Sequence, residues 1–353
     1  MKKTIAVLPG DGVGPEIVSV SVAVLEAIAK KYRHDFAFTY ADIGGVAIDT
    51  QGDPFPSTTQ NICERSDAIL FGAIGDPKFD NDPSAKVRPE QGLLAMRRKY
   101  GLYANIRPIM LFPGSENKSP LKPEILKDVD FVVVRELTGG IYFGEPRGRS
   151  ERGDKAFDTC VYTKDEIVRV AKFAFDLAAK RRKKLTVVDK ANVLATSRLW
   201  RQTIQEMSTG FPDIAIEYMF VDNAAMQIIK RPSEFDVIVT ENMFGDILTD
   251  EASIITGSIG MLPSASIGDK LALYEPIHGS FPRAKGKNIA NPIGTILSAA
   301  MLLEYSFGLQ KEGDAVRRAV HTVLTQGYGT SDIVSDGAIG TKEFGEKITH
   351  EIR

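Results

Sequence analysis

Short runs of β-branched and other apolar residues alternate along this chain with longer segments whose apolar residues have helical spacing. Each short run has the length of a buried strand, and each longer segment has the length of a helix. The alternation predicts an α/β fold with a mostly parallel or mixed sheet. We see no internal repeat and no low-complexity segment. The strand-like runs are 4–9, 67–73, 130–136, 184–190, 214–222 and 236–241, and the helix-like segments are 15–32, 164–181, 197–207 and 291–307.

The composition limits the classes of protein to which the chain can belong. Its 353 residues, 43% of them hydrophobic, are enough for a large core and more than one domain. The net charge of −2 argues against a general nucleic-acid or membrane-surface binder. The two cysteines are far apart, no apolar stretch reaches the ~18 residues of a membrane span, and the N-terminal apolar run is too short for a signal peptide. We therefore expect a soluble, cytoplasmic protein.

Two polar segments interrupt the alternation. Residues 110–124 contain three prolines and predict a loop at a domain junction. Residues 139–162 are polar and glycine-rich, with short β-prone pieces on either side, and this pattern indicates a projecting hairpin or arm.

Four of the strand-like runs stop at an ionisable residue that precedes a turn or a helix start. Ligands of open α/β sheets collect outside the carboxyl ends of the strands. A single such residue is more often a helix cap or a surface charge, but four successive cases favour a shared polar cleft. The four residues are Arg135, Lys190, Asp222 and Asp246.

Asp246 lies four positions before Asp250, so a helix would bring both carboxylates to one face. Together with Asp222 they supply only hard oxygen ligands, which suit Mg²⁺ or Mn²⁺ and disfavour zinc. Taken alone, Asp246 is equally well explained as an N-cap after a turn, and Asp250 as part of a solvated helix face.

Three arginines follow or flank apolar segments: Arg97, Arg107 and Arg135. The planar guanidinium binds carboxylates through two parallel hydrogen bonds, so three of them suit a di- or tricarboxylate substrate, although each alone is more often a surface ion-pair partner. Lys190, just beyond a buried strand, is a candidate base. Tyr142, after a Gly-Gly turn, is a candidate proton donor, and its alternative is an ordinary packing residue.

The glycine-rich stretch LPGDGVGPE (8–16) is not a Rossmann fingerprint. Pro15 follows Gly14, so the spacing G-x-G-x-x-G is absent, and no acidic residue follows at the expected distance. A second glycine-rich stretch, 275–292, has backbone amides that are able to surround a ligand, but from the residues alone it is equally well an ordinary surface loop.

Seven ordered motifs together carry a specific resemblance. They occur between residues 8 and 292 as LPGDGVGPEI, RPEQGLLAMRRKYGLYANIRP, VVRELTGGIYFG, VDKANVL, VDNAAMQI, ENMFGDILTDEAS and PIHGS followed by NIANP. They resemble the isocitrate/isopropylmalate dehydrogenase family of β-hydroxyacid oxidative decarboxylases. The match covers nearly the whole chain.

The resemblance implies a two-domain, non-Rossmann α/β fold. A discontinuous cofactor-binding domain, 1–103 plus 257–353, would enclose an inserted substrate, metal and dimerisation domain, 104–256. The resemblance also implies a homodimer that pairs partly through an arm near 139–162. Each active site would take Lys190 and Asp222 from the partner subunit.

The resemblance further implies NAD-dependent, metal-dependent oxidative decarboxylation of a substituted malate. Arg97, Arg107 and Arg135 would bind its carboxylates, and Asp222, Asp246 and Asp250 would hold Mg²⁺ or Mn²⁺. Lys190 would act as the base, with Tyr142 as the donor of a proton to C3 and Asp222 also counted in the catalytic set. Glu90 would lie at both the substrate and the cofactor. The other implied cofactor residues are Gly75, Asp76, His278, Gly279, Ser280, Arg283, Asn288 and Asn291.

The residues before Arg97 bear on the substrate. Leu93 and Leu94 form an apolar patch one turn before the arginine, where burial of an isopropyl group would contribute roughly 1.5–3 kcal/mol. Isocitrate dehydrogenases of the same family have small polar residues there, so the leucines favour 3-isopropylmalate and hence leucine biosynthesis. The alternatives are that both leucines are core residues, or that the substrate is homoisocitrate, tartrate, malate or isocitrate.

One position departs from the pattern of the NAD-using relatives, many of which have an aspartate where this chain has Arg283. An acid there would bind the ribose 2′-hydroxyl, whereas Arg283 with Lys285 suits a 2′-phosphate. We expect NAD and keep NADP as the alternative. A non-catalytic regulatory paralogue is disfavoured because the implied base, proton donor and metal ligands are all present.

Overall fold

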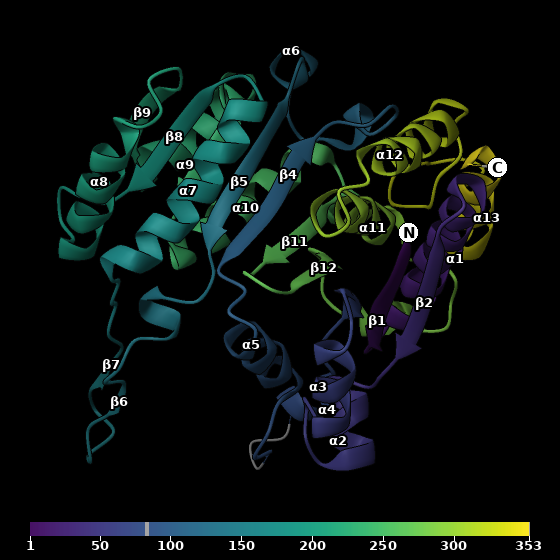
Figure 1. Cartoon of the computed structure of the whole chain (residues 1–353), viewed down its shortest axis with the longest axis horizontal. Helices are drawn as coiled ribbons and strands as arrows, with labels where there is room; N and C mark the ends of the chain where they lie inside the picture. Colours follow the sequence, from purple (N-terminus) through teal and green to yellow (C-terminus); the bar gives the residue numbers. More distant parts are fainter. Residues whose placement is uncertain (82–84, 353) are drawn as a thin grey trace. The chain divides into compact units, whose positions relative to one another are not determined.

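The computed structural model describes residues 1–81 and 85–352, and its chain divides into two compact units (Figure 1). Unit 1 comprises Met1–Tyr100, Phe112–Ser119 and Thr256–Arg353. Unit 2 comprises Gly101–Leu111 and Pro120–Ile255, and its sequence lies between the segments of unit 1. The predicted domain boundaries after residues 103 and 256 stay a prediction, since the contacts also place 112–119 with unit 1.

The sheet of unit 1 has the strand order β2-β1-β3-β12-β11. The pairs β1–β2, β1–β3 and β3–β12 are parallel, and β11–β12 is antiparallel. Buried apolar residues fill β1 and β3, as expected for strands covered on both faces. The strands are β1 (Lys2–Gly10), β2 (Asp35–Tyr40), β3 (Ala68–Ala73), β11 (Pro263–Ile267) and β12 (Ala272–Pro276).

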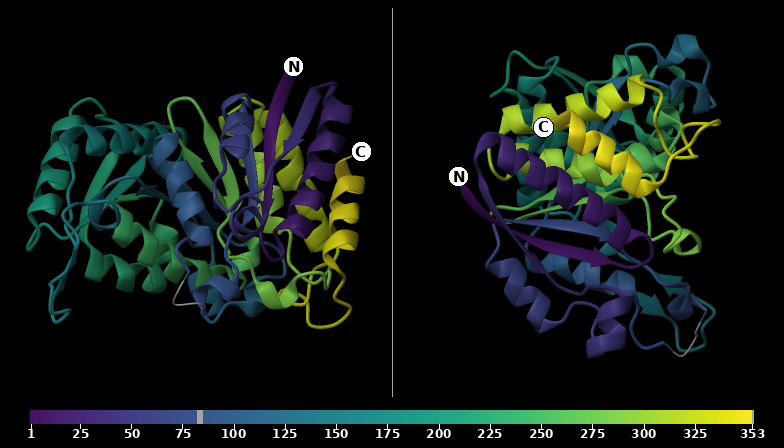
Figure 2. Two further views of the ribbon diagram at one scale, coloured as in Figure 1. Left: turned by 90° about the horizontal axis from the view of Figure 1, so that it is seen from below. Right: turned by 90° about the vertical axis from the view of Figure 1, so that its right-hand side faces the viewer.

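The core of unit 1 lies between this sheet and its long helices. Helix α11 is buried along nearly its whole length, and Figure 2 shows α1 and α13 side by side. Pro15 lies in the first turn of α1, where its missing N–H costs no hydrogen bond. The helices are α1 (Gly14–Tyr32), α2 (Gly45–Gln51), α3 (Ser57–Glu64), α4 (Pro77–Asp80), α5 (Pro89–Lys99), α11 (Ile293–Tyr305), α12 (Gln310–Thr325) and α13 (Thr341–Ile352), with 3₁₀ turns η1 (Glu116–Lys118), η5 (Ile259–Met261) and η6 (Pro282–Ala284).

The sheet of unit 2 has the strand order β4-β5-β10-β8-β9. The strands β5, β10, β8 and β9 are mutually parallel, and β4 is antiparallel to β5. The parallel pairing places the carboxyl ends of these four strands at one edge of the sheet. The predicted α/β fold with a mixed, largely parallel sheet is confirmed. The strands are β4 (Ala104–Met110), β5 (Asp130–Glu136), β8 (Lys184–Asp189), β9 (Ala215–Phe220) and β10 (Val237–Thr240).

The helices of unit 2 begin where side chains satisfy their first N–H groups. Thr163 and Glu166 form a capping box at α7. Helix α10 begins at Asn242, because the Glu241 carboxylate accepts a hydrogen bond from the N–H of Phe244. The alternative that Asp246 is an N-cap is therefore wrong. The helices are α6 (Pro123–Leu126), α7 (Lys164–Lys180), α8 (Ala195–Ser208), α9 (Val221–Lys230) and α10 (Asn242–Ser253), with 3₁₀ turns η2 (Gly140–Tyr142), η3 (Pro232–Glu234) and η4 (Ile254–Thr256).

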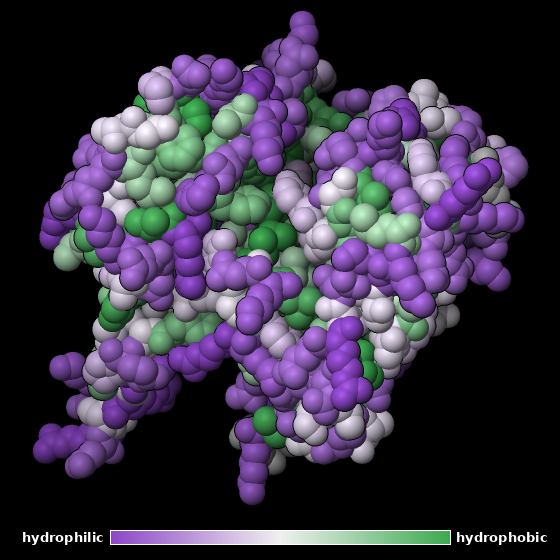
Figure 3. Space-filling view, in the orientation of Figure 1, coloured by the Kyte–Doolittle hydropathy of each residue, from purple (hydrophilic) through white to green (hydrophobic). Residues whose placement is uncertain are grey.

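Residues 139–162 contain a two-stranded antiparallel hairpin, β6 (Gly148–Arg149) with β7 (Ala156–Phe157). In Figure 1 the hairpin extends away from the helices of unit 2, and Figure 3 shows that hydrophilic residues predominate on it. Within the described ranges, no helix combines the length and the apolar character that a bilayer crossing requires.

Candidate active site

Arg135 lies in β5 with its side chain almost wholly buried, and α10 holds it in place. Its Nε and Nη2 donate to Oδ1 of Asn242 at 3.0 and 2.8 Å, and its Nη1 forms an ion pair with Asp246. Its aliphatic stem packs under Gly245, where an added Cβ would lie 2.6 Å from Cγ of Arg135. Charge, shape and hydrogen bonding therefore fix one orientation of this guanidinium.

Oδ2 of Asp246 also accepts a hydrogen bond from the hydroxyl of Tyr142 at 2.8 Å. Burial alone would raise the pKa of Asp246, but Arg135 and the Tyr142 hydroxyl hold it below its usual range. Burial and the bond to Asp246 raise the pKa of Tyr142, so the phenol keeps its proton at neutral pH. The alternative that Tyr142 is a packing residue does not fit its exposed ring and its bond to a carboxylate.

Arg107, on β4, is held in the same manner as Arg135. Its Nε donates to Asn105 at 2.9 Å, and its Nη1 donates to Thr249 at 2.8 Å and lies 3.4 Å from Oδ1 of Asp250. The side chain of Asp250 is 70% exposed. Each of the two acids of α10 is thus paired with an arginine of a neighbouring strand.

Lys190 and Asp222 form a separate ion pair at the ends of β8 and β9. The Lys190 ammonium lowers the pKa of the exposed Asp222 carboxylate. Among the described residues, no three His, Cys, Asp or Glu side chains lie close enough together to hold a metal. A single chain therefore brings Asp246 and Asp250 together, while Asp222 is held by Lys190.

A buried clamp that the sequence analysis missed supports Lys190. Arg201 of α8 donates to both oxygens of Asp189, at 2.7 and 2.9 Å, and Asp189 also accepts the N–H of Ala191. The Arg201 guanidinium lies over the rings of Tyr218 and Phe220 on β9. In the sequence, Arg201 is only the last residue of SRLWR. Nothing in that stretch indicates that it pairs with Asp189, twelve residues earlier.

In unit 1, Arg97 lies on α5 and donates to Glu275 of β12 at 3.0 Å. Glu275 is a second residue that the sequence analysis did not identify. Leu93 is half-buried and Leu94 is 42% exposed, so the alternative that both are core residues is wrong. The leucines lie one turn before Arg97, as predicted from their spacing.

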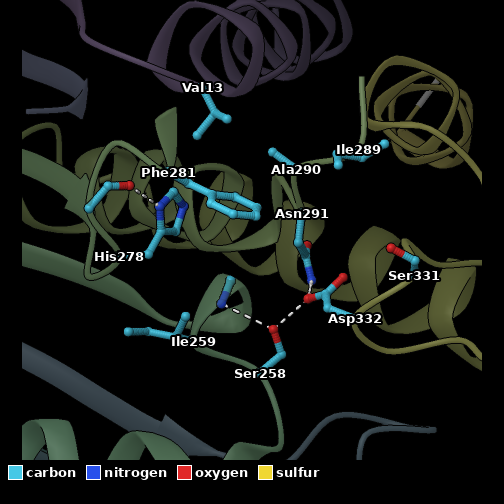
Figure 4. Close-up of a pocket in the computed structure, with 12 residues that line it drawn as sticks. Val13, Ser258, Ile259, His278, Phe281, Ile289, Ala290, Asn291, Ser331 and Asp332 are labelled. Carbon is cyan, nitrogen blue, oxygen red and sulfur yellow. Dashed lines mark hydrogen bonds between the residues drawn. The ribbon is translucent and has the colours of Figure 1, made fainter. Parts of the chain in front are cut away.

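A cavity of about 530 Å³ lies within unit 1 (Figure 4). His278, Gly279 and Asn291, predicted as cofactor residues, line it together with Val13, Phe281 and Ile289. Asp332, also at the cavity and not predicted, accepts hydrogen bonds from Asn291 at 2.9 Å and from Ser258. The polar groups on one side and the apolar side chains opposite suit a planar heteroaromatic ring.

His278 gives a direct test of whether a ligand fits this cavity. Its Nδ1 lies 2.8 Å from the carbonyl of Gly279, whereas its buried Nε2 has no hydrogen-bond partner in the structure. Burial lowers the pKa of His278, so a neutral ring with one buried, unpaired nitrogen lies in the wall of the cavity (Figure 4). A buried polar atom without a partner is costly, and a heterocycle able to form a hydrogen bond would satisfy it.

Two other predicted cofactor residues, Glu90 and Ser280, lie beside Gly75. A Cβ at this position, which has φ +118°, would lie 3.0 Å from Oε1 of Glu90 and 3.4 Å from Oγ of Ser280. The Gly75 N–H donates to Asp11, which also binds the N–H groups of Gly45 and Val46 at the start of α2. Asp76 caps α4.

The stretch LPGDGVGPE supports the second glycine-rich loop. The Glu16 carboxylate accepts hydrogen bonds from the N–H groups of Gly286 and Asn288, and the N–H of Val13 donates to the carbonyl of Ser280 at 2.9 Å. The Asn288 side chain accepts from the N–H of Lys342, while Arg283 is exposed in η6. The two stretches thus form one structure, which the sequence alone left open.

Comparison with known proteins identifies the family. The sequence profile described as isocitrate/isopropylmalate dehydrogenase matches residues 4–348. The chain belongs to this family. A 3-isopropylmalate dehydrogenase of Bacteroides fragilis is 56% identical over 351 residues, which cover 99% of this chain and 98% of that protein. A 3-isopropylmalate dehydrogenase of Aquifex aeolicus is 55% identical over 357 residues, and the alignment covers 100% of this chain and 98% of that protein.

Solved structures of the family have the same fold. The crystal structure of isocitrate dehydrogenase from Methylococcus capsulatus has a TM-score of 0.88 at 34% identity and covers 99% of each chain. A β-decarboxylating dehydrogenase from Thermococcus kodakarensis has a TM-score of 0.82 at 35% identity, covering 99% of this chain and 96% of that one. The predicted fold class of this chain, that of the isocitrate/isopropylmalate dehydrogenase family, is confirmed.

Proposed function

We propose that this dehydrogenase catalyses the metal-dependent oxidative decarboxylation of (2R,3S)-3-isopropylmalate to 4-methyl-2-oxopentanoate and CO₂, with reduction of NAD, in leucine biosynthesis. The main support for this substrate is the sequence identity of 55–56%, over essentially the whole length, to 3-isopropylmalate dehydrogenases. The likeness to an isocitrate dehydrogenase is at 34% identity. The exposed Leu94 beside half-buried Leu93 supports an apolar substituent on the malate.

The carboxylates of the substrate would bind the guanidinium groups of Arg97, Arg107 and Arg135. Each of these arginines is oriented by a side chain of its own unit: Glu275 for Arg97, Asn105 for Arg107 and Asn242 for Arg135. Because the orientation is fixed before binding, little conformational entropy is lost when a carboxylate arrives.

The metal-binding proposal rests on the donor set of α10. Asp246 and Asp250 are oxygen ligands on one face of one helix, which fits Mg²⁺ or Mn²⁺, because these cations accept one or two carboxylates and take their other ligands from substrate and water. Asp222 of the partner subunit would complete the set. When bound, the cation supplies Lewis-acid stabilisation of the negative charge that develops on the C2 oxygen.

The proton transfers are assigned to Lys190 and Tyr142, with Lys190 supplied by the partner subunit. Lys190 of the partner subunit, as the neutral amine, would accept the proton of the C2 hydroxyl, directly or through a water, as the hydride leaves C2 for the cofactor. Tyr142 would donate its proton to C3 after CO₂ has left. The raised pKa of its phenol keeps that proton available at neutral pH.

The cavity of unit 1 is the proposed site of the adenine end of the cofactor. The unpaired Nε2 of His278 and the carboxylate of Asp332 provide polar partners for a heterocycle. Gly75, Glu90 and Ser280, which lie close together in the structure, would bind further along the dinucleotide. Arg283 and Lys285 leave the choice between NAD and NADP to experiment.

A homodimer is proposed because of the distribution of groups on unit 2. Asp222 is held by Lys190 of its own chain, and a third carboxylate beside Asp246 and Asp250 would be Asp222 of the partner subunit. Met226 on α9 and Ile247 on α10 are large apolar side chains that are exposed in the single chain, as expected of a surface that another subunit covers.

The proposed function also includes a cytoplasmic location.

A spectrophotometric assay with Mg²⁺ tests the proposal by crossing 3-isopropylmalate, isocitrate, homoisocitrate, tartrate and malate with NAD⁺ and NADP⁺. We expect the highest kcat/KM with 3-isopropylmalate and NAD⁺. Faster turnover of isocitrate would contradict the substrate, and a preference for NADP⁺ would contradict the cofactor and implicate Arg283. Absence of turnover with every pair would favour a regulatory paralogue.

A further inference from the structure

Asn242 is a buried polar side chain with three hydrogen bonds near the proposed active site, yet it is assigned no part in substrate, metal or cofactor binding. It is the first residue of α10 and is 1% exposed. Its Oδ1 accepts two N–H groups of Arg135, and its Nδ2 donates to the carbonyl of Gly139 at 3.1 Å. Its own N–H donates to the hydroxyl of Tyr162 at 2.9 Å.

These bonds join three parts of unit 2 that carry proposed active-site residues. Arg135 belongs to β5, Gly139 begins the turn that carries Tyr142, and Asn242 itself begins the helix of Asp246 and Asp250. The turn has little freedom of its own, since an added Cβ on Gly139 or Gly140 would lie 2.7 or 2.4 Å from the Tyr162 side chain. The turn is thus packed on one ring and held by the Asn242 carboxamide at the Gly139 carbonyl, by the Glu136 carboxylate at the Gly139 N–H and by the Val161 carbonyl at the Gly140 N–H.

The carboxamide is chemically specific for this place. It presents an acceptor to a cation and a donor to a backbone carbonyl from one planar group, which neither a carboxylate nor an aliphatic side chain does. An aspartate would keep the contact with Arg135 but would face the Gly139 carbonyl with a second oxygen. It would also neutralise the guanidinium that is needed by a substrate carboxylate.

We propose that Asn242 is a positioning residue of the reaction: its carboxamide sets the orientation of the Arg135 guanidinium and, through Gly139, the place of Tyr142 relative to Asp246. This inference rests on the proposed binding of a substrate carboxylate by Arg135, and not on which substituted malate the enzyme prefers. A residue with a purely structural role would affect stability without affecting the KM for the malate.

The test compares Asn242→Asp and Asn242→Ala with the wild-type enzyme, using full kinetics and thermal unfolding of the intact protein with Mg²⁺. We expect Asn242→Asp to unfold at a higher temperature than Asn242→Ala, because its volume and its contact with Arg135 are kept. Its KM for 3-isopropylmalate should rise about tenfold or more and its kcat should fall, because the Arg135 guanidinium would no longer be correctly oriented toward the substrate carboxylate. The KM for NAD⁺ should not change. Asn242→Ala should show the same kinetic defect together with a lower unfolding temperature.

Tyr162→Phe is the matched control. It removes the acceptor of the Asn242 N–H but keeps the ring against Gly139 and Gly140, so it should lower the unfolding temperature and leave the KM for the malate unchanged. A wild-type KM in Asn242→Asp, or equal changes in the KM values for malate and NAD⁺, would overturn the proposal. If the wild-type enzyme prefers another substituted malate, the proposed substrate is wrong. The KM of each variant relative to wild type, measured with that malate, then decides the role of Asn242.

Discussion

At the scale of residues, the two acids of α10 differ in their surroundings although they lie one turn apart. The Asp246 side chain is 37% exposed and already has two partners, Arg135 and Tyr142. Asp250 is 70% exposed and only 3.4 Å from Arg107. Asp246 is therefore tied to Arg135 and Tyr142, the proposed carboxylate-binding and proton-donating residues, whereas Asp250 can be replaced with little disturbance of its neighbours.

This difference makes Asp250→Asn the cleaner test of the proposed metal site. The amide keeps the size of the side chain but loses a negative oxygen ligand, so we expect a loss of about 10- to 100-fold in apparent Mg²⁺ affinity. Initial rates measured against Mg²⁺ concentration give this value. Glu251→Gln, the next residue on the helix, is the control and should behave as wild type. An unchanged Mg²⁺ dependence in Asp250→Asn would show that Asp250 is not a ligand.

Glu241, the N-cap of α10, makes a prediction about pH. Burial raises the pKa of this carboxyl from 4.5 to about 7, with a further contribution from Glu136. The folded state therefore holds a proton that the unfolded state has lost. The contribution of Glu241 to stability is full below pH 4.5 and is lost as the pH rises through about 7.

Glu241→Gln should remove this pH dependence, because a glutamine can still accept the N–H of Phe244. We expect the gain in unfolding free energy over wild type to be about 2 kcal/mol larger at pH 8 than at pH 5. Urea unfolding at the two pH values measures it. A gain that is equal at both pH values would mean that the folded carboxyl titrates as the unfolded one does.

At the scale of elements, the sequence predicted those strands that are continuous apolar runs, such as β5 and β10. It did not single out β11 (Pro263–Ile267), whose two serines interrupt the pattern. That strand is buried because α11 covers it, and the hydroxyl of Ser298 accepts the N–H of Ser264. A strand whose polar groups are satisfied by a distant helix has no local signature.

Gly245 tests how closely α10 packs on β5. Gly245→Ala would place a methyl group 2.6 Å from Cγ of Arg135, which forces the helix or the arginine to move. We expect a loss of about 1–3 kcal/mol in unfolding free energy and a raised KM for the malate. Urea unfolding and kinetics measure the two effects. Gly210→Ala, where the nearest atom would be 3.4 Å away, should change neither, and a harmless Gly245→Ala would contradict the close packing.

At the scale of the whole molecule, the sequence could place the candidate residues at strand ends but could not say which would meet. Arg135 and Asp246 were both singled out, and they are partners in the structure. Their common neighbour, Asn242, was not, because its role depends on hydrogen bonds to residues more than one hundred positions away. Likewise, Lys190 was identified, but the Arg201–Asp189 clamp beneath it was not. Packing between elements determines such partners, and local patterns do not record it.

The central claim is that two chains share each active site, with Asp246 and Asp250 from one and Asp222 from the other. Subunits carrying Asp222→Asn are mixed with subunits carrying Asp246→Asn after reversible dissociation, and NADH formation from 3-isopropylmalate with Mg²⁺ is measured. In a mixed dimer one site would have no substitution and the other would have both. We predict that two nearly inactive preparations regain about a quarter of the wild-type rate on random pairing. No gain over the separate variants, with subunit exchange demonstrated, would contradict the shared site.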